Sequence, residues 1–129
     1  MEKCNVLAFL LCEKATASAD GKVTLHGLFD RIEVSGKPRS SKPFCVYYKV
    51  VVKEPCRISL RVVDSSGLEV SGNWCDSISQ IGPMHAVWSL VSGLFKEPGP
   101  YVLELRQESD GGEEVSLANT VFVVDQRAE

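Results

Sequence analysis

Strict alternation of apolar and polar residues is the feature that most limits how this chain can fold. Apolar side chains occupy every second position from Ile58 to Val62, and Tyr101, Leu103 and Leu105 repeat the pattern. Because successive side chains of a β-strand point to opposite faces, this period places one face on a core and the other in solvent. No segment of ten or more residues shows the spacing of an amphipathic helix. The sequence therefore predicts an all-β fold.

Turn residues divide the chain into about eight strands. Asp20-Gly21, Asp64–Gly67 and Asp110–Gly112 provide the glycines that tight turns need. Asp76–Pro83 fits either an irregular loop or one short helical turn. Short strands at this spacing are typical of an antiparallel β-sandwich. The expected strands are Cys4–Cys12 (buried on both sides), Val23–Val34 (with a bulge or bend at Gly27), Phe44–Lys53, Arg57–Asp64, Leu68–Trp74, His85–Phe95, Tyr101–Gln107 and Val115–Val124.

Length and charge agree with a single sandwich domain spanning residues 1–129. A chain of 129 residues buries enough surface to fold without a metal or a disulfide. Its net charge of −3 offers no overall attraction to nucleic acid or to anionic lipid, so we expect neither as a partner. Lys37, Arg39 and Lys42 make Ser35–Pro43 basic. A basic loop without interleaved aromatic residues is typical of a solvated linker.

The five cysteines indicate a reducing compartment. Their odd number leaves at least one thiol unpaired, and no CxxC motif is present. Most of them lie in or beside apolar runs, where a reduced cysteine packs as a small hydrophobic residue. We therefore expect a cytoplasmic protein with free thiols. The cysteines in or beside apolar runs are Cys4, Cys12, Cys45 and Cys56.

An exported protein is the alternative, with Met1–Ala19 as its signal peptide. Lys3 would be the charged start and Asn5–Cys12 the apolar region. Against this, the apolar stretch is short, and charged Glu13 and Lys14 follow it directly. The same residues are better explained as the first strand.

Two stretches of the chain together resemble a family of short bacterial proteins of unknown function. The first is Leu11-Cys12 leading into Asp20–Arg31, and the second is Phe95 followed by Gly99–Leu105. Members of that family look like small β-sandwich domains without an assigned activity. The second stretch also resembles a strand start of immunoglobulin-like sandwiches, although paired core cysteines and a central tryptophan are missing at their usual spacing. The resemblance implies an immunoglobulin-like sandwich and no particular function.

Catalysis has little support in the sequence. A hydrolase needs a nucleophile, a base within hydrogen-bond reach and an orienting acid. The best serine set is Ser77 or Ser89 with His85 and Asp76. A cysteine set would pair Cys75 with His85. Because no Gly-x-Ser-x-Gly turn accompanies either set, we expect that the protein is not an enzyme.

Metal and cofactor sites are not expected either. Carboxylates gather at one hairpin tip, where they usually stay solvated, and the cysteines and histidines lack the spacing of a zinc site. The calcium candidates at that tip are Glu108, Asp110, Glu113 and Glu114. The zinc candidates are Cys56, Cys75, His26 and His85.

The expected function is that of a non-catalytic domain that binds another protein or a second copy of itself. The alternative is a sandwich that binds a carbohydrate or another small molecule through exposed aromatic residues. The aromatic candidates for partner or ligand contact are Trp74, Trp88, Tyr47 and Tyr48.

Self-association is favoured by two long, valine-rich strands that lack internal proline. Phe44–Val52 and Val115–Val124 would pair or pack with a second copy if they lay at a sheet edge or on an exposed face. The competing interpretation is that both strands are central and that one core takes up their valines. The positions chosen for mutagenesis are Val46, Val50, Val121 and Val123.

Overall fold

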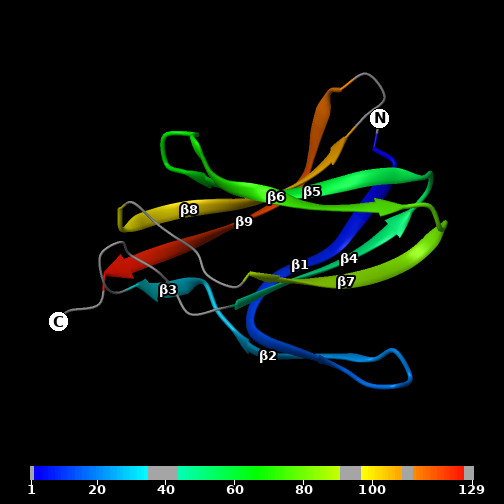
Figure 1. Cartoon of the computed structure of the whole chain (residues 1–129), viewed down its shortest axis with the longest axis horizontal. Coiled ribbons are helices and arrows are strands. Elements are labelled where there is room, and N and C mark those ends of the chain that lie inside the picture. Colours follow the sequence, from blue (N-terminus) through cyan, green and yellow to red (C-terminus); the bar gives the residue numbers. More distant parts are fainter. Residues whose placement is uncertain (1, 35–43, 91–96, 109–111, 127–129) are drawn as a thin grey trace.

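The computed structural model describes residues 2–34, 44–90, 97–108 and 112–126, and of residues 71–74, 90 and 126 it describes the backbone alone. Its strands form two packed sheets, seen as an upper and a lower layer in Figure 1. The predicted all-β sandwich is therefore confirmed. The strands are β1 (Cys4–Ala17), β2 (Val23–Leu28), β3 (Arg31–Val34), β4 (Phe44–Val52), β5 (Cys56–Asp64), β6 (Glu69–Ile78), β7 (Gly82–Leu90), β8 (Gly99–Glu108) and β9 (Glu114–Gln126).

The sheets differ in their strand order. Sheet A has the order β2-β1-β4-β7, and sheet B has the order β3-β9-β8-β5-β6. Pairings between the described strands are antiparallel except that of β3 with β9, which is parallel. The expectation of a purely antiparallel sandwich is corrected at this one pair.

The chain changes sheets between β2 and β3. The single strand expected over Val23–Val34 is therefore two strands, one in each sheet. The backbone N–H of Phe29 donates to Leu11 in sheet A, and the carbonyl of Asp30 accepts from Val123 in sheet B. Gly27 precedes the change with a φ of +69°, and a Cβ there would lie 2.8 Å from the Glu13 side chain. The expected bend at this glycine is present.

The core lies between the sheets and uses every second residue of the central strands. On β4, Val46, Tyr48 and Val50 are fully buried, while the residues between them point to the opposite face of sheet A. β5 and β8 provide the facing residues of sheet B, including Leu60 and Leu105. The alternation that predicted the fold therefore also locates its core.

The two valine-rich strands differ in position. β4 lies between β1 and β7 along its length, whereas β9 pairs with β8 and meets the short β3 only at Val123–Gln126, so in the described structure Glu114–Phe122 lies at the edge of sheet B. Val46 and Val50 face sheet B and are fully buried, which removes them as contact positions. Val121 is 54% exposed on sheet B, and Val123 is half-buried. The interpretation of a central strand therefore holds for Phe44–Val52, while Val115–Phe122 lies at an edge as the alternative expectation allowed.

Two further boundaries differ from expectation. Asp76–Pro83 contains no helical turn, because β6 continues to Ile78 and β7 begins at Gly82. The first strand is not buried on both sides, since Leu7 is 58% exposed and Leu10 is 39% exposed. The described residues contain no helix that could span a membrane.

Candidate functional site

The outer face of sheet A carries mainly apolar side chains where β1, β4 and β7 lie side by side and polar ones along the β1–β2 hairpin. Outward residues follow from the register, because the cross-strand partners of Cys45, Tyr47 and Val51 point the same way. β2 adds Leu28, which lies opposite Cys12. We call this surface the apolar face; it consists of Leu7, Ala8, Leu10, Leu28, Cys45, Tyr47, Val51, Pro83 and Val87. Cys12 has the same parity but is fully buried. The polar residues on this side of sheet A are Asn5, Lys14, Thr16, Thr24, His26, Lys49, His85 and Ser89.

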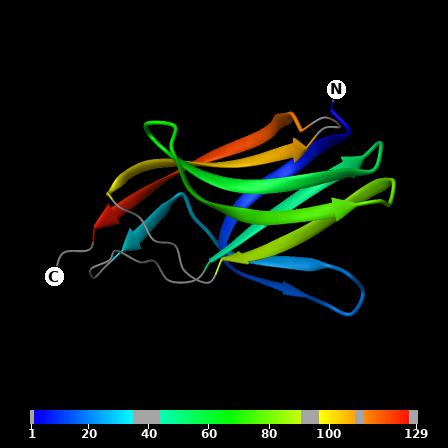
Figure 2. The same ribbon diagram turned by 45° about the horizontal axis from the view of Figure 1, so that its top comes forward.

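Two irregular features of sheet A leave leucines of this face exposed to solvent: a register shift in β1 and the β1–β2 hairpin. A register shift between Val6 and Ala8 makes Leu7 an additional residue of β1. At the other end, β1 leaves β4 after Cys12 and continues only with β2, as a hairpin that extends past the sheet (Figures 1 and 2). Leu28 lies at the base of this hairpin and is 61% exposed. Bulge and hairpin therefore leave apolar side chains uncovered at both ends of the face.

Polar groups on the apolar face contact one another across β4 and β7. The Tyr47 hydroxyl lies 3.3 Å from Nδ1 of His85, and the two rings meet edge to face with centroids 5.9 Å apart. Lys49 is the cross-strand partner of His85. Antiparallel sheets usually place polar residues on their solvent side, so the exposed leucines of this face depart from the usual pattern.

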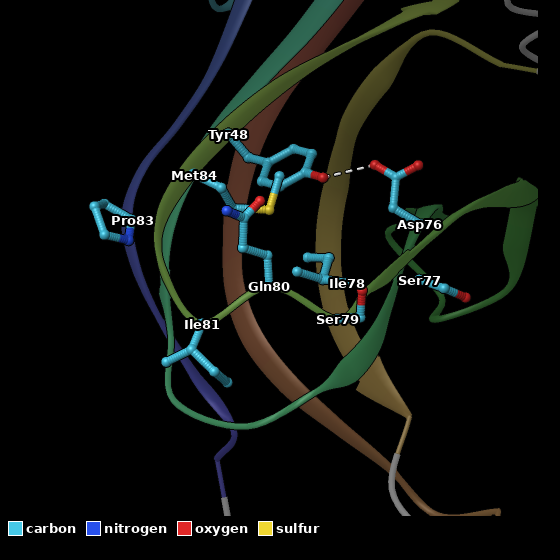
Figure 3. Close-up of a pocket in the computed structure, with 9 residues that line it drawn as sticks. All are labelled: Tyr48, Asp76, Ser77, Ile78, Ser79, Gln80, Ile81, Pro83 and Met84. Carbon is cyan, nitrogen blue, oxygen red and sulfur yellow. Dashed lines mark hydrogen bonds between the residues drawn. The ribbon is translucent and has the colours of Figure 1, made fainter.

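A second candidate site is a pocket of about 410 Å³ where β6 connects to β7. The Tyr48 hydroxyl donates a hydrogen bond of 2.6 Å to the Asp76 carboxylate, which links sheet A to sheet B (Figure 3). Burial raises the pKa of Tyr48, and the hydrogen bond to Asp76 raises it further. The pocket is lined by Tyr48, Asp76, Ser77, Ile78, Ser79, Gln80, Ile81, Pro83 and Met84.

The four aromatic candidates occupy different environments. Tyr47 is half-buried on the apolar face. Tyr48 and Trp88 point inward, where their rings pack with centroids 4.6 Å apart, so neither is an exposed contact residue. The backbone of Trp74 pairs with Leu60 on β5, and its side chain lies outside the description.

The hydrolase candidates are not brought together in the described structure. Asp76 accepts its hydrogen bond from Tyr48, while His85 contacts Tyr47 on the far side of sheet A. Ser89 lies 3.9 Å from the sulfur of Cys45, and Ser77 is exposed on β6.

The metal candidates are likewise dispersed. Among the described residues, no three histidine, cysteine or acidic side chains gather around a common point. At the hairpin tip, Glu108 pairs with Arg57 and Glu114 pairs with Arg106. Asp110 and the basic residues Lys37, Arg39 and Lys42 lie outside the described residues.

All five cysteines are free thiols in this structure. Burial raises the pKa of Cys4 to about 12, with a further contribution from neighbouring Cys56. Burial also raises the pKa of Cys12, which lies opposite Cys45. Cys75 is exposed on β6 and accepts a hydrogen bond of 3.0 Å from Arg57. The thiols therefore range from inert core groups to an accessible surface group.

Two features of these sites were missed from the sequence. Leu7 and Leu10 were expected inside, because an unbroken apolar run is typical of a strand covered on both faces. The signal that could have corrected this is Glu13-Lys14, which shows that the strand continues into solvent. The bond between Tyr48 and Asp76 joins residues 28 positions apart in the sequence and has no local signature.

Comparison with known proteins identifies a family and a fold. A family model described as "Family of unknown function (DUF6941)" matches residues 7–119. This confirms the resemblance to a family of unknown function. No match was found among curated proteins.

Several solved structures are similar to this chain. The C-terminal domain of wzt shares 11% identity over 99% of this chain and 77% of that one, with a TM-score of 0.51. CopC from Methylosinus trichosporium OB3b shares 20% identity over 78% of this chain and 87% of that one, with a TM-score of 0.42. The PmoD soluble domain from Methylocystis sp. ATCC 49242 (Rockwell) shares 14% identity over 95% and 98%, with a TM-score of 0.42. At 11% identity, the likeness to the wzt domain shows a shared fold alone.

Proposed function

The chain belongs to the family of unknown function DUF6941, and we propose that it is a non-catalytic interaction domain that forms a homodimer through the apolar face. One observation carries the proposal. Leu7, Leu10 and Leu28 are exposed together on the solvent side of an antiparallel sheet. A monomer gains nothing from apolar side chains there, whereas a partner that covers them removes their surface from water.

The shape of the face favours a second copy over a small ligand. The face is an open sheet surface, while small ligands bind in concave sites. Sheets pack face to face at about 10 Å through interdigitating side chains, as the two sheets of this sandwich already do. A twofold axis is the commonest symmetry of such assemblies, and it needs only one self-complementary surface.

The size of the face predicts a weak dimer. Nine residues of β4 span about 30 Å and three adjacent strands about 14 Å, which gives a footprint of about 430 Å² before side-chain relief and Leu28 are added. Specific complexes usually bury about 800 Å² on each partner, and smaller interfaces are typical of weak association. We therefore expect dissociation in the micromolar range.

Charge does not oppose this arrangement. Lys49 lies two residues from Tyr47 along β4, or about 7 Å. A twofold axis near Tyr47 would keep the two Lys49 side chains about 13 Å apart. That separation exceeds the Debye length of about 8 Å at physiological ionic strength.

Light scattering after gel filtration tests the proposal between about 5 and 500 µM protein. The mass is expected to rise with concentration from 14.1 kDa towards twice that value. Leu10→Lys should hold the mass at the monomer value, while Val121→Lys, a matched change on the outer face of sheet B, should leave the rise intact. A constant monomer mass, or equal disruption by both variants, would contradict the homodimer.

A further inference from the structure

The pocket between β6 and β7 shares Pro83 with one end of the apolar face, and it contains an acid with no cationic partner among the described residues. Asp76 lies opposite Ile58, whose side chain is fully buried, so the carboxylate faces the space between the sheets. Its hydrogen bond comes from the uncharged Tyr48 hydroxyl. Among the described residues, no lysine, arginine or histidine forms an ion pair with Asp76. One acceptor position of the carboxylate is therefore available to the pocket.

Apolar side chains lie beside this acid. In Figure 3, Ile78 lies between Asp76 and Met84, and Ile81 lies below them in the loop before β7. Ile78 is buried and Met84 is half-buried, whereas Ile81 is 57% exposed. The volume of about 410 Å³ lies at the lower end of the range of ligand pockets, about 300–1,000 Å³. The pocket therefore combines one negative charge with a short apolar wall and with the polar residues Ser77, Ser79 and Gln80, whose side-chain amide lies beside Met84 in Figure 3.

We propose that this pocket binds a small organic cation, with its ammonium group hydrogen-bonded to Asp76 and its alkyl or aryl substituent against Ile81 and Met84. The charge supplies selectivity, because a half-buried carboxylate regains from an ammonium group the hydrogen bonds that it loses to burial. The apolar wall supplies affinity through removal of the substituent from water. Tyr48 has a positioning role, since its hydroxyl donates to Oδ2 of Asp76, while Oδ1 accepts no hydrogen bond from the described residues.

A charge series of one alkyl chain tests this inference on the whole protein. Methyl signals of Ile78, Ile81 and Met84 are followed by NMR during titration with hexylammonium, hexanol and hexanoate. We expect saturable shifts, with hexylammonium binding about tenfold more tightly than hexanol and hexanoate binding least. Equal binding of hexylammonium and hexanol, or no saturable shift with any of the three, would overturn the proposal.

A pair of matched variants tests whether Asp76 causes the preference for hexylammonium over hexanol. Asp76→Asn keeps an acceptor for the Tyr48 hydroxyl and removes the charge, so hexylammonium and hexanol should then bind within about threefold of each other. Asp125→Asn makes the same change outside the pocket and should retain the tenfold preference. A preference that survives Asp76→Asn would assign the cation to another site. If Asp76→Asn fails to fold, the charge series on the unchanged protein still decides.

Discussion

The two outer faces of the sandwich share one backbone geometry and carry opposite chemistry. On sheet B, Glu104 lies 3.2 Å from Nε of Arg61 and 3.0 Å from Nε of Arg106. Two further ion pairs, Arg57 with Glu108 and Arg106 with Glu114, extend this ladder along the sheet. On sheet A, the equivalent cross-strand positions hold pairs such as Leu10 with Tyr47.

This contrast separates what the fold requires from what function adds. Both sheets need an apolar inner face; β4 provides one along its length, and β8 provides one from Tyr101 to Leu105 before the buried Gln107. Neither sheet needs an apolar outer face, and sheet B shows that this topology accommodates charge there. The leucines on sheet A therefore call for an explanation beyond folding, and coverage by a second copy provides one.

Charging the apolar face should give the largest effect. The double variant Leu10→Lys and Leu28→Lys places four positive charges in the proposed interface, and its dimer dissociation constant should rise at least about a hundredfold. The free energy of unfolding of the monomer should fall by about 1 kcal/mol, because Leu28 is 61% exposed whereas Leu10 is 39% exposed and loses some packing. Sedimentation and urea denaturation measure the two quantities. A lower free energy of unfolding with an unchanged dimer dissociation constant would show that the apolar face serves folding, as the ion pairs of sheet B do.

Breaking the ion pairs on sheet B should lower folding stability and not affect dimerisation. Glu104→Gln removes the charge that serves both Arg61 and Arg106, and only 17% of the Glu104 side chain is exposed. We expect a loss of about 1 kcal/mol in the free energy of unfolding, since partly buried pairs resist screening. The dimer dissociation constant should be unchanged. Weakening of the dimer by this variant would place sheet B in the interface.

Added salt should have the smallest effect. It should weaken the ion pairs on sheet B, whereas it should not weaken dimerisation through the apolar face. Raising ionic strength from about 0.1 M to about 1 M shortens the Debye length from about 10 Å to about 3 Å. The ladder of sheet B should then contribute a few tenths of a kcal/mol less to stability. Association through the apolar face should stay constant or strengthen, because it does not depend on charge attraction. Dissociation of the dimer by salt would indicate an electrostatic interface instead.

Strands were predictable where apolar and polar residues alternate, because every second residue of such a strand faces the core. The alternation of Arg57–Asp64 and Tyr101–Gln107 locates β5 and β8 to within two residues at each end. The break in Val23–Val34 was not predictable, because apolar residues continue through Phe29. The choice of sheet there depends on pairing with β9, at the far end of the sequence.

The candidate sites were predictable only in part. Tyr47 was selected as an aromatic residue and lies on the apolar face. Trp88 was selected on the same grounds. It packs inward against Tyr48, because it lies opposite the buried Val46 and points the same way. Composition shows which residues can make contacts, whereas register decides which face receives them. Asp76 became a ligand candidate only when its partner in the other sheet was known.

Concentration-dependent alkylation of two cysteines tests the central claim most directly. Cys45 is half-buried on the apolar face, and Cys75 is exposed on the outer side of sheet B. Both are labelled in one sample with N-ethylmaleimide between about 5 and 500 µM protein and are read separately by mass spectrometry. We predict that the labelling rate of Cys45 falls about fivefold when total protein is about ten times the dissociation constant, while that of Cys75 stays constant. Constant labelling of Cys45 across this range, or protection of Cys75 instead, would contradict a homodimer formed through the apolar face.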